Sequence, residues 1–464
     1  MDKNNKFLQK IYLSSPSWIK SIMATLYSWK VSRKKYGKIY EHWRNKLKET
    51  ERYSTKDLNQ YQNKLAYDYF TFLNENSAYF KDYFTRYKID FSAPDFRTEI
   101  KKLPVITKKD VLEDYEDILI SEQLFDKRYK FSSSGTTGRA LSVYLDQDAY
   151  EREYAFRMHY LSIAGMERKK KTAYFLGNRL FADKNKPPFH ICDYFENGIY
   201  FSIFHLSDQT IKYYVNAFNK YKPEFIKGYP SALYSLAYLA KENGLDLTPL
   251  KGIFSASEML HDFQKELLED VFKTKVYQWY GQVETTVNIH ECEHGKFHIK
   301  EEYGFLELLN QKGEDAQPGE EASVIGTSWG NRAFPLLRYD TGDNMILAEN
   351  QECACGRNGR IIEKIIGRDE DVIITPDGKH IGRLDFVFKP VHTVIESQIV
   401  QLSKNEILVN VVPAESFSKD DENLIIETLQ KYVGDLFKIS LKLVDQVERT
   451  KSGKIRYVVN KINK

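Results

Sequence analysis

The sequence predicts an α/β protein with a large N-terminal domain of mostly parallel sheets covered by helices, a barrel-like subdomain, and a small C-terminal α+β domain. Between residues 172 and 281, short apolar runs alternate with helical stretches, the pattern of a parallel sheet with helices on both faces. Residues 297 to 345 are rich in short strand-like runs separated by turns, which favours the barrel-like subdomain. After Gly367-Arg368 the pattern becomes that of a small α/β domain with a helix over 419–433.

We expect three parts along the chain. Residues 1–95 are predicted to be a helical lead-in, because apolar and aromatic side chains recur at helical spacing over 61–84. Residues 96–367 are predicted to form the main domain, with the barrel-like part near 297–366. Residues 368–464 are predicted to form the small domain.

Charge and composition exclude some classes of function. The 464 residues include 68 Lys and Arg against 65 Asp and Glu, a net charge of +3, so no nucleic-acid partner is expected. No run approaches the ~18 apolar residues of a membrane span. The polar start of the chain leads into no signal-peptide core, and the four cysteines are too few for a disulfide scaffold in a chain of this length. We therefore expect a cytoplasmic protein.

Contact with a membrane surface or with a second copy stays open. Ile19–Trp29 is a short apolar run flanked by lysines, and such a segment can rest on a membrane surface. A helix packed against the rest of the protein is the alternative that we favour. The sequence allows a dimer without indicating one.

A run of small residues at 131–139 has the composition of an anion-binding loop. Glycine allows positive φ and a close approach to a ligand, and consecutive backbone N–H groups with Ser/Thr hydroxyls form a concave anion site. Composition alone favours an ordinary surface turn instead. The residues predicted to hold phosphate are Ser133, Ser134, Gly135, Thr136, Thr137, Gly138 and Arg139.

Three polar loops follow predicted strands of the parallel sheet. They are Gly228-Tyr229-Pro230-Ser231, Ser255-Ala256-Ser257-Glu258 and Tyr280-Gly281. Because ligands bind at the carboxyl ends of parallel strands, these loops predict one rim of a pocket. Tyr229, Pro230 and Trp279 are the candidate substrate contacts, and their apolar rings favour an aromatic or apolar ligand.

Five short patterns follow one another along the chain, namely Ser132–Arg139, Tyr280–Glu284, Arg338–Asp343, Gly367–Asp371 and Lys451–Lys454. Together they resemble the adenylate-forming (ANL) superfamily, and within it the branch of the phenylacetate–CoA ligase-like proteins, including those linked to capsular polysaccharide biosynthesis. The resemblance implies an ANL-type main domain with a small mobile lid. It also implies ATP-dependent activation of a small carboxylic acid as an acyl-adenylate, with Mg²⁺, followed by acyl transfer to CoA.

The same resemblance assigns nucleotide contacts in this chain. Ser257 and Glu258 match the loop beside adenine, and Tyr280 with Gly281 would lie against the base. Asp343 would accept both ribose hydroxyls, since a carboxylate has two acceptor oxygens. Two positions depart from the family pattern, because Ser257 replaces a glycine and Val283 replaces a Thr or Ser.

The resemblance also assigns the charged groups of the reaction. Glu284 would bind Mg²⁺, a hard cation that needs few protein carboxylates beside phosphate oxygens. Lys454 matches the catalytic lysine of the family, and Thr136 would help to catalyse the reaction from the phosphate loop. Arg368 would contact the ribose or the phosphates. Glu370, two positions after this arginine, matches the family's hinge residue, about which the small domain turns.

Three cysteines and a histidine have the composition of a structural zinc site. Cys292 and His298 form one pair, and Cys353 and Cys355 form a second pair. Three thiolates and one imidazole complete a closed zinc shell, which leaves no open position for catalysis. His290 and His294 are alternative ligands. The other interpretation is free thiols with solvated histidines, since the spacing is not that of a standard zinc finger.

Two other functions stay open. Adenylation can be followed by transfer to an amine or hydroxyl acceptor in surface polysaccharide biosynthesis. A catalytically silent nucleotide-binding protein is the third hypothesis. Retention of Glu284, Asp343 and Lys454 argues against it, because charges in a pocket cost stability unless they are used or solvated.

Overall fold

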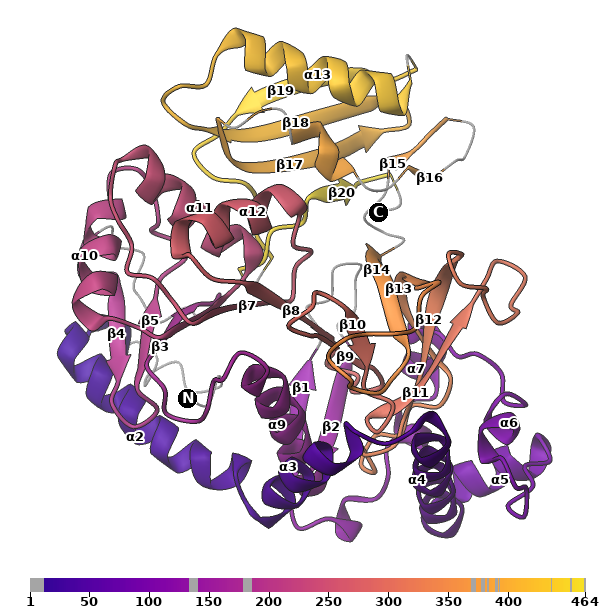
Figure 1. The fold of residues 1–464 in the computed structure, drawn as a ribbon. Helices are drawn as coiled ribbons and strands as arrows, with labels where there is room; N and C mark the ends of the chain where they lie inside the picture. The colour runs from indigo at the N-terminus through magenta and orange to yellow at the C-terminus, as the bar shows by residue number, and fades with distance from the viewer. Residues whose placement is uncertain are drawn as a thin grey trace. The chain divides into compact units, whose positions relative to one another are not determined.

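The computed structural model describes residues 12–132, 141–177, 186–368, 373–376, 380–381, 384–388, 391, 393–434, 436–450 and 453–462. The α/β fold predicted from the sequence is confirmed (Figure 1). The chain divides into two compact units that alternate along the sequence. The first unit comprises Met1–Trp29, Arg168–Val276 and Gly367–Lys464, and the second comprises Lys30–Glu167 and Tyr277–Ile366.

The first unit contains the predicted parallel strands. Their order is β7-β6-β3-β5-β4, with β3, β5, β6 and β7 parallel and β4 antiparallel to β5. The bounds are β3 (Thr172–Phe175), β4 (His190–Asp193), β5 (Gly198–Phe201), β6 (Phe225–Gly228) and β7 (Gly252–Ala256). Strand β4 was not expected, because it is a short edge strand in which His190 and Cys192 are only half-buried.

Three helices pack on these strands and supply most of the core of this part. They are α10 (Ile211–Tyr221), α11 (Pro230–Glu242) and α12 (Asp262–Phe272). In α11 every residue from Pro230 to Ala240 is buried, so this helix lies inside the unit and not on its surface. Helix α2 (Ser17–Lys35) begins in the first unit and runs beside β4 (Figure 1).

The C-terminal part of the first unit is a small α+β fold. Its sheet has the order β19-β18-β17-β20, and α13 (Lys419–Val433) packs on it through Ile425, Leu429 and Val433. Ser418 and Asp421 form a reciprocal capping box at the start of α13. The strands are β15 (Ile373–Ile374), β16 (His380–Ile381), β17 (Val394–Ser403), β18 (Glu406–Pro413), β19 (Lys438–Leu443) and β20 (Val458–Asn460), with the 3₁₀ helix η2 (Leu384–Phe388).

The second unit combines N-terminal helices with antiparallel strands. Its strand order is β11-β12-β13-β14-β10-β9-β8, and β1 pairs separately with β2. The strand bounds are β1 (Arg128–Ser132), β2 (Ser142–Asp146), β8 (Val276–Gly281), β9 (Asn288–Glu291), β10 (Phe297–Ile299), β11 (Gly304–Leu309), β12 (Glu321–Ser328), β13 (Tyr339–Leu347) and β14 (Ile361–Arg368). The strand-rich stretch predicted after residue 297 thus forms antiparallel strands.

The helices of the second unit begin with α3 (Lys38–Thr50), which packs against α9. The others are α4 (Thr55–Asn76), α5 (Ala78–Arg86), α6 (Phe96–Ile100), α7 (Lys108–Glu113), α8 (Tyr115–Ile118), η1 (Glu122–Leu124) and α9 (Gln147–Ser162). Aromatic side chains of α4 and α5 enter one core, where the Phe70 and Phe84 rings stack with centroids 4.9 Å apart. This core accounts for some of the 32 Tyr and 28 Phe residues of the chain.

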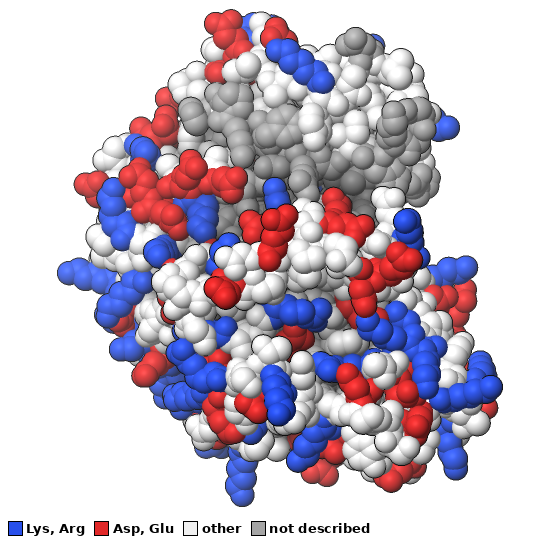
Figure 2. All heavy atoms as spheres, turned by 45° about the vertical axis from the view of Figure 1, so that its right-hand side comes forward, with Lys and Arg blue, Asp and Glu red and all other residues white. Residues whose placement is uncertain are grey.

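Charges of both signs cover the surface. Figure 2 shows Lys and Arg side chains interspersed with Asp and Glu over the face that it draws, in keeping with the nearly balanced composition. Among the described residues, no helix is both long enough and apolar enough to span a bilayer.

A buried ion pair fixes the segment that leads into β13. The Arg338 guanidinium donates to both carboxylate oxygens of Glu307 at 2.9 Å, and it also donates to the carbonyls of Lys101 and Leu103. Burial holds the pKa of Glu307 above its usual value although Arg338 acts against this. Residue Ile106 then pairs with this segment through two backbone hydrogen bonds, Ile106 N–H to Arg338 O and Asp340 N–H to Ile106 O.

Replacing Arg338 by alanine is expected to lower the free energy of unfolding by about 3–5 kcal/mol, because the buried Glu307 carboxylate then lacks its counter-charge. Urea denaturation followed by circular dichroism measures this change. The matched control is Arg86→Ala, which breaks an ion pair with Asp82 whose side chains are 65% and 69% exposed and is expected to cost less than about 1 kcal/mol. Equal losses in the two variants would contradict a structural role for the buried pair.

Candidate active site

The nucleotide motifs of the second unit meet through one hydrogen bond. The Tyr280 hydroxyl, at the end of β8, donates to Asp343 Oδ2 at 2.6 Å. Asp343 lies on β13 and is buried. Its neighbour Gly342 has φ of +71°, a conformation that glycine adopts without strain. The structure thus joins two predicted site residues that are 63 positions apart in sequence.

Glu284 lies in a tight turn after β8. Thr285 N–H donates to Gln282 O at 3.2 Å, and Thr285 has φ of +55°. The Glu284 side chain is only 7% exposed, so its carboxylate is held in a fixed environment. Val283, which departs from the family pattern, packs against the aromatic core of this unit, so the methyl groups contribute to packing where a hydroxyl was expected.

Trp279 is fixed by polar groups of the same unit. Its indole Nε1–H donates to Asn288 Oδ1 at 3.1 Å, and the Arg157 guanidinium lies 4.9 Å from the centre of its ring. Burial of an indole requires such a partner for the N–H. The ring orientation is therefore set by contacts within the protein.

The predicted substrate residues of the first unit lie where β6 gives way to α11. Tyr229 is buried and its N–H donates to Phe175 O at 3.1 Å, while Pro230 occupies the first turn of α11. A proline at this place costs no hydrogen bond, because the first N–H groups of a helix have no partner in it. At Gly228 a Cβ atom would lie 2.8 Å from Phe175 O, so the loop passes too close to β3 for another residue.

Glu258 connects two distant segments of the first unit. Its carboxylate accepts the Ser231 N–H at 3.1 Å through one oxygen and the Ile455 N–H at 2.8 Å through the other. Burial raises the pKa of Glu258, and the hydrogen bonds from Ser231 and Ile455 act against that rise. Ser257 has φ of +76°, so the serine keeps the backbone conformation that the family's glycine adopts easily.

Lys454 lies on a tight turn held by backbone hydrogen bonds. Thr450 N–H donates to Lys454 O at 2.9 Å, and Lys454 N–H donates to the Thr450 hydroxyl at 3.1 Å. At Gly453 a Cβ atom would lie 2.8 Å from Gly177 Cα, and its φ is +84°. Only glycine fits there, so the close approach places the lysine turn against the end of β3.

Several predicted residues lie outside the described part of the chain. These are the phosphate-loop residues Ser133, Ser134, Gly135, Thr136, Thr137, Gly138 and Arg139, and the hinge candidate Glu370. Arg368 ends β14. The loop was predicted to stand between two strands, and β1 and β2 confirm this, since Ser132 pairs with Ser142 across the hairpin.

The four predicted metal ligands come together in the second unit. The ligand atoms of Cys292, His298, Cys353 and Cys355 all lie within 4.8 Å of one another. Cys292 Sγ and Cys353 Sγ are 3.6 Å apart, and Cys355 Sγ is 3.3 Å from His298 Nε2. Ligands of tetrahedral zinc at their usual bond lengths are separated by about 3.5–3.8 Å. The donor set and its spacing fit that metal.

Groups beside this cluster orient the His298 imidazole and place charged side chains next to it. His298 Nδ1 lies 3.1 Å from Asn358 O, which directs Nε2 toward the thiols when Nδ1 holds the proton. Burial lowers the pKa of His298 to about 4, so the ring is neutral at pH 7, as a metal ligand must be. Next to the cluster, Arg357 pairs with Glu51 at 3.3 Å and with Glu293.

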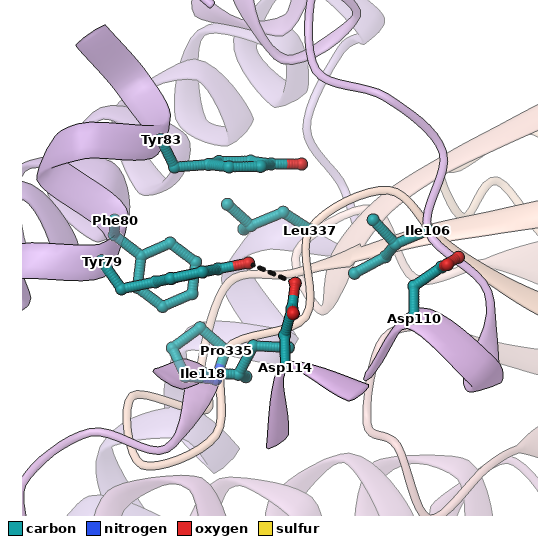
Figure 3. Close-up of a pocket in the computed structure, with 9 residues that line it drawn as sticks. All are labelled: Tyr79, Phe80, Tyr83, Ile106, Asp110, Asp114, Ile118, Pro335 and Leu337. Carbon is teal, nitrogen blue, oxygen red and sulfur yellow. Dashed lines mark hydrogen bonds between the residues drawn. The ribbon is translucent and has the colours of Figure 1, made fainter. Parts of the chain in front are cut away.

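A groove in the second unit lies apart from these residues. Figure 3 shows it between the aromatic rings of α5 and the start of α7, with Tyr79 OH donating to Asp114 Oδ2 at 3.2 Å. Ile106, Pro335 and Leu337 also line it. Of the predicted site residues that the structure describes, none lines this groove.

Comparisons with known proteins agree with the motifs. A model of the CapK C-terminal domain matches residues 373–461. Protein CapK of Staphylococcus aureus is 24% identical over 466 aligned positions, which cover 98% of this chain and 100% of that protein. Phenylacetate-coenzyme A ligase of Thermus thermophilus is 25% identical over 272 positions, 52% of this chain and 61% of the ligase. These matches support the resemblance of the chain to the adenylate-forming superfamily.

Within this superfamily the matches support a resemblance to the phenylacetate–CoA ligase-like branch. The structure of 2-hydroxyisobutyryl-CoA ligase in the postadenylation state, in complex with 2-HIB-AMP, aligns with a TM-score of 0.67 at 16% identity. The alignment covers 89% of this chain and 91% of that one. This likeness shows that the fold is shared.

The sequence did not reveal how the site residues are supported. The contact from Glu258 to Ile455 joins positions 197 residues apart, and Gln264 Nε2 donates to Tyr457 OH at 2.8 Å. No local pattern could have found either contact. The Asn358 carbonyl beside His298 was also missed, because every residue has a backbone carbonyl and no side-chain pattern marks this one.

Replacing Glu258 by glutamine is expected to loosen the lysine turn. The glutamine amide places an NH₂ group against one of the two N–H donors, so one hydrogen bond is lost. Amide hydrogen exchange at Ile455 should then accelerate roughly tenfold. The matched control is Glu269→Gln, since Glu269 accepts the Val276 N–H elsewhere in this unit. Unchanged exchange at Ile455 would contradict the proposed support.

Proposed function

We propose that this protein activates a small carboxylic acid with ATP as an acyl-adenylate and transfers the acyl group to CoA. The observation that supports this most is the hydrogen bond from Tyr280 to Asp343, which holds together two motifs that the family uses for the nucleotide. Adenylate formation is the part that the family resemblance supports. The identity of the acid and the acyl acceptor are the finer parts of the proposal.

The arrangement around Asp343 suits a ribose. Tyr280 donates to Oδ2, which helps to fix the orientation of the carboxylate, and carboxylate oxygens are acceptors for hydroxyl donors. We infer that Tyr280 and Gly281 lie beside adenine, and that the loop at Ser257 and Glu258 closes the adenine side. The phosphate loop, Ser133 to Arg139, is proposed to hold the β- and γ-phosphates through backbone N–H groups and hydroxyls.

Two charged residues are proposed to act on the reacting groups. Glu284, which is buried, would hold Mg²⁺ together with phosphate oxygens, and the metal would reduce the repulsion between phosphate and carboxylate. Lys454 would place its ammonium between the incoming carboxylate and the α-phosphate. The turn from Thr450 to Lys454 and the support from Glu258 would keep this lysine in position.

Acid recognition and the acceptor are proposed from the residues at the strand ends. The rings of Tyr229 and Trp279, with Pro230, favour an aromatic or apolar acid. Transfer to an amine or hydroxyl acceptor in surface polysaccharide biosynthesis is the second candidate, because the match to Protein CapK covers 98% of this chain. Formation of product that depends on CoA separates the two candidates.

We also propose the domain boundaries and a structural metal. The C-terminal domain would begin near residue 368 and turn at Glu370, with Arg368 reaching the nucleotide, so that the removal of Lys454 admits the acceptor. Cys292, His298, Cys353 and Cys355 would hold a structural Zn²⁺, because the closed donor set and the spacing of its atoms fit this ion.

Replacing Lys454 by alanine is expected to reduce ATP–pyrophosphate exchange by roughly 10²–10³-fold, because a preorganised charge at the α-phosphate is lost. The assay uses a panel of aryl, fatty and amino acids. The matched control is Lys442→Ala, since Lys442 is an exposed lysine of the same domain, and it should keep full exchange.

Exchange with one class of acid would identify the substrate class. Full exchange in the Lys454→Ala variant would overturn the role of this lysine. Binding of ATP without exchange for any acid in the panel would instead favour a silent nucleotide-binding protein.

Purified protein is expected to contain about one Zn²⁺ per chain, measured by inductively coupled plasma mass spectrometry. Cys292→Ser and Cys355→Ser should each lose the metal and lower the midpoint of thermal unfolding, because the metal links β9 and β10 to the segment at 353–355. Cys192→Ser is the matched control, since this thiol lies in the other unit. Wild-type protein purified without chelator that lacks zinc would contradict the site.

A further inference from the structure

Helix α2 presents its large apolar side chains to solvent. Trp18 is 66% exposed, Ile22 is 48% exposed and Leu26 is 61% exposed. With Trp29, these residues are spaced by four, four and three positions, so they form one stripe along the helix. Surface helices usually turn such a stripe toward the core.

The small polar side chains of α2 attach the helix to the protein. The Ser21 hydroxyl accepts the Cys192 N–H at 3.0 Å, and the Thr25 hydroxyl accepts the Tyr194 N–H at 3.0 Å. Ser21 also donates to the carbonyl one turn before it, as does Thr25. Ser21 and Thr25 therefore lie on the side of α2 nearest to β4, next to the apolar stripe, whose side chains are exposed.

The exposed apolar side chains of the protein are concentrated on this helix. Among the described residues, five of the sixteen large hydrophobic side chains that are exposed lie between Trp18 and Trp29. Tyr194, bonded through its backbone to Thr25, is 68% exposed and extends the same surface. A contiguous apolar patch of this kind marks a surface that binds a partner.

The charges of α2 indicate which partner fits. The helix contains no acidic residue, and Lys30, Arg33 and Lys34 are exposed at its C-terminal end. Tryptophan and tyrosine favour the boundary between water and lipid, and cations beside them are attracted to anionic lipid headgroups. Parallel pairing with a second copy is disfavoured, because it would bring the basic C-terminal ends of two helices together.

We propose that α2 is a membrane-surface helix that places Trp18, Ile22, Leu26 and Trp29 at the headgroup boundary of a bilayer containing anionic lipid. The two tryptophans are separated by about 16 Å along the helix axis, so the stripe can lie flat in the interface. This proposal does not depend on acid activation. It reverses the preference, drawn from the sequence, for a helix whose apolar face is packed inside.

The test is flotation of the full-length protein with vesicles. One set contains phosphatidylcholine alone, and the other contains phosphatidylcholine with phosphatidylglycerol. The variant Trp18→Ser/Ile22→Ser/Leu26→Ser removes the stripe, and Lys30→Glu/Arg33→Glu reverses the charge. The matched control is Leu402→Ser/Leu424→Ser, which removes exposed apolar side chains of the C-terminal domain. Circular dichroism checks that each variant is folded.

The wild type and the control are expected to float with the anionic vesicles and to bind neutral vesicles much more weakly. Both α2 variants should bind at least roughly tenfold less, and higher salt should weaken the binding. Failure of the wild type to float overturns the proposal, as does flotation that the stripe variant leaves unchanged. A dimer that the stripe variant dissociates, without vesicle binding, would assign the surface to a second copy and also overturn it.

Discussion

The Arg338 guanidinium is buried, and its hydrogen bonds constrain three separate segments of the second unit. It pairs with Glu307 on β11 and with the carbonyls of Lys101 and Leu103. A buried charge that loses its partners is costly, so these segments can only be placed together. Because Arg338 immediately precedes β13, the same constraint sets the position of Asp343, on which the nucleotide proposal rests.

Most of the fold could be predicted from the sequence where the local pattern and the packing agree. The helix expected at 419–433 has the observed bounds of α13, since its capping box and its apolar spacing both indicate a helix that begins at residue 419. Strand β4 was missed because an edge strand carries a weak pattern. Helix α2 was predicted as a helix, but the exposure of its apolar stripe was not expected. Helical periodicity indicates that apolar side chains share one face, but it does not indicate whether that face is packed or exposed.

The candidate site could be predicted as a set of residues but not as a set of contacts. Ser257 shows why, since the expected glycine is absent while the positive φ that glycine allows is kept. Val283 differs from Ser257. Its side chain replaces the expected hydroxyl and packs against the hydrophobic core. Supports such as Glu258 to Ile455 depend on tertiary structure, and nothing local in the sequence encodes them.

The attachment of α2 to β4 has a consequence for the sheet itself. An edge strand that offers free N–H groups is a template for pairing with other chains, and the hydroxyls of Ser21 and Thr25 accept the N–H groups of Cys192 and Tyr194. The N-terminal helix therefore also protects the sheet from edge-to-edge growth. A chain shortened past Thr25 would leave the N–H groups of Cys192 and Tyr194 without their hydroxyl acceptors. Water or the strand of another chain would then have to accept from them, and pairing with another chain would lower solubility.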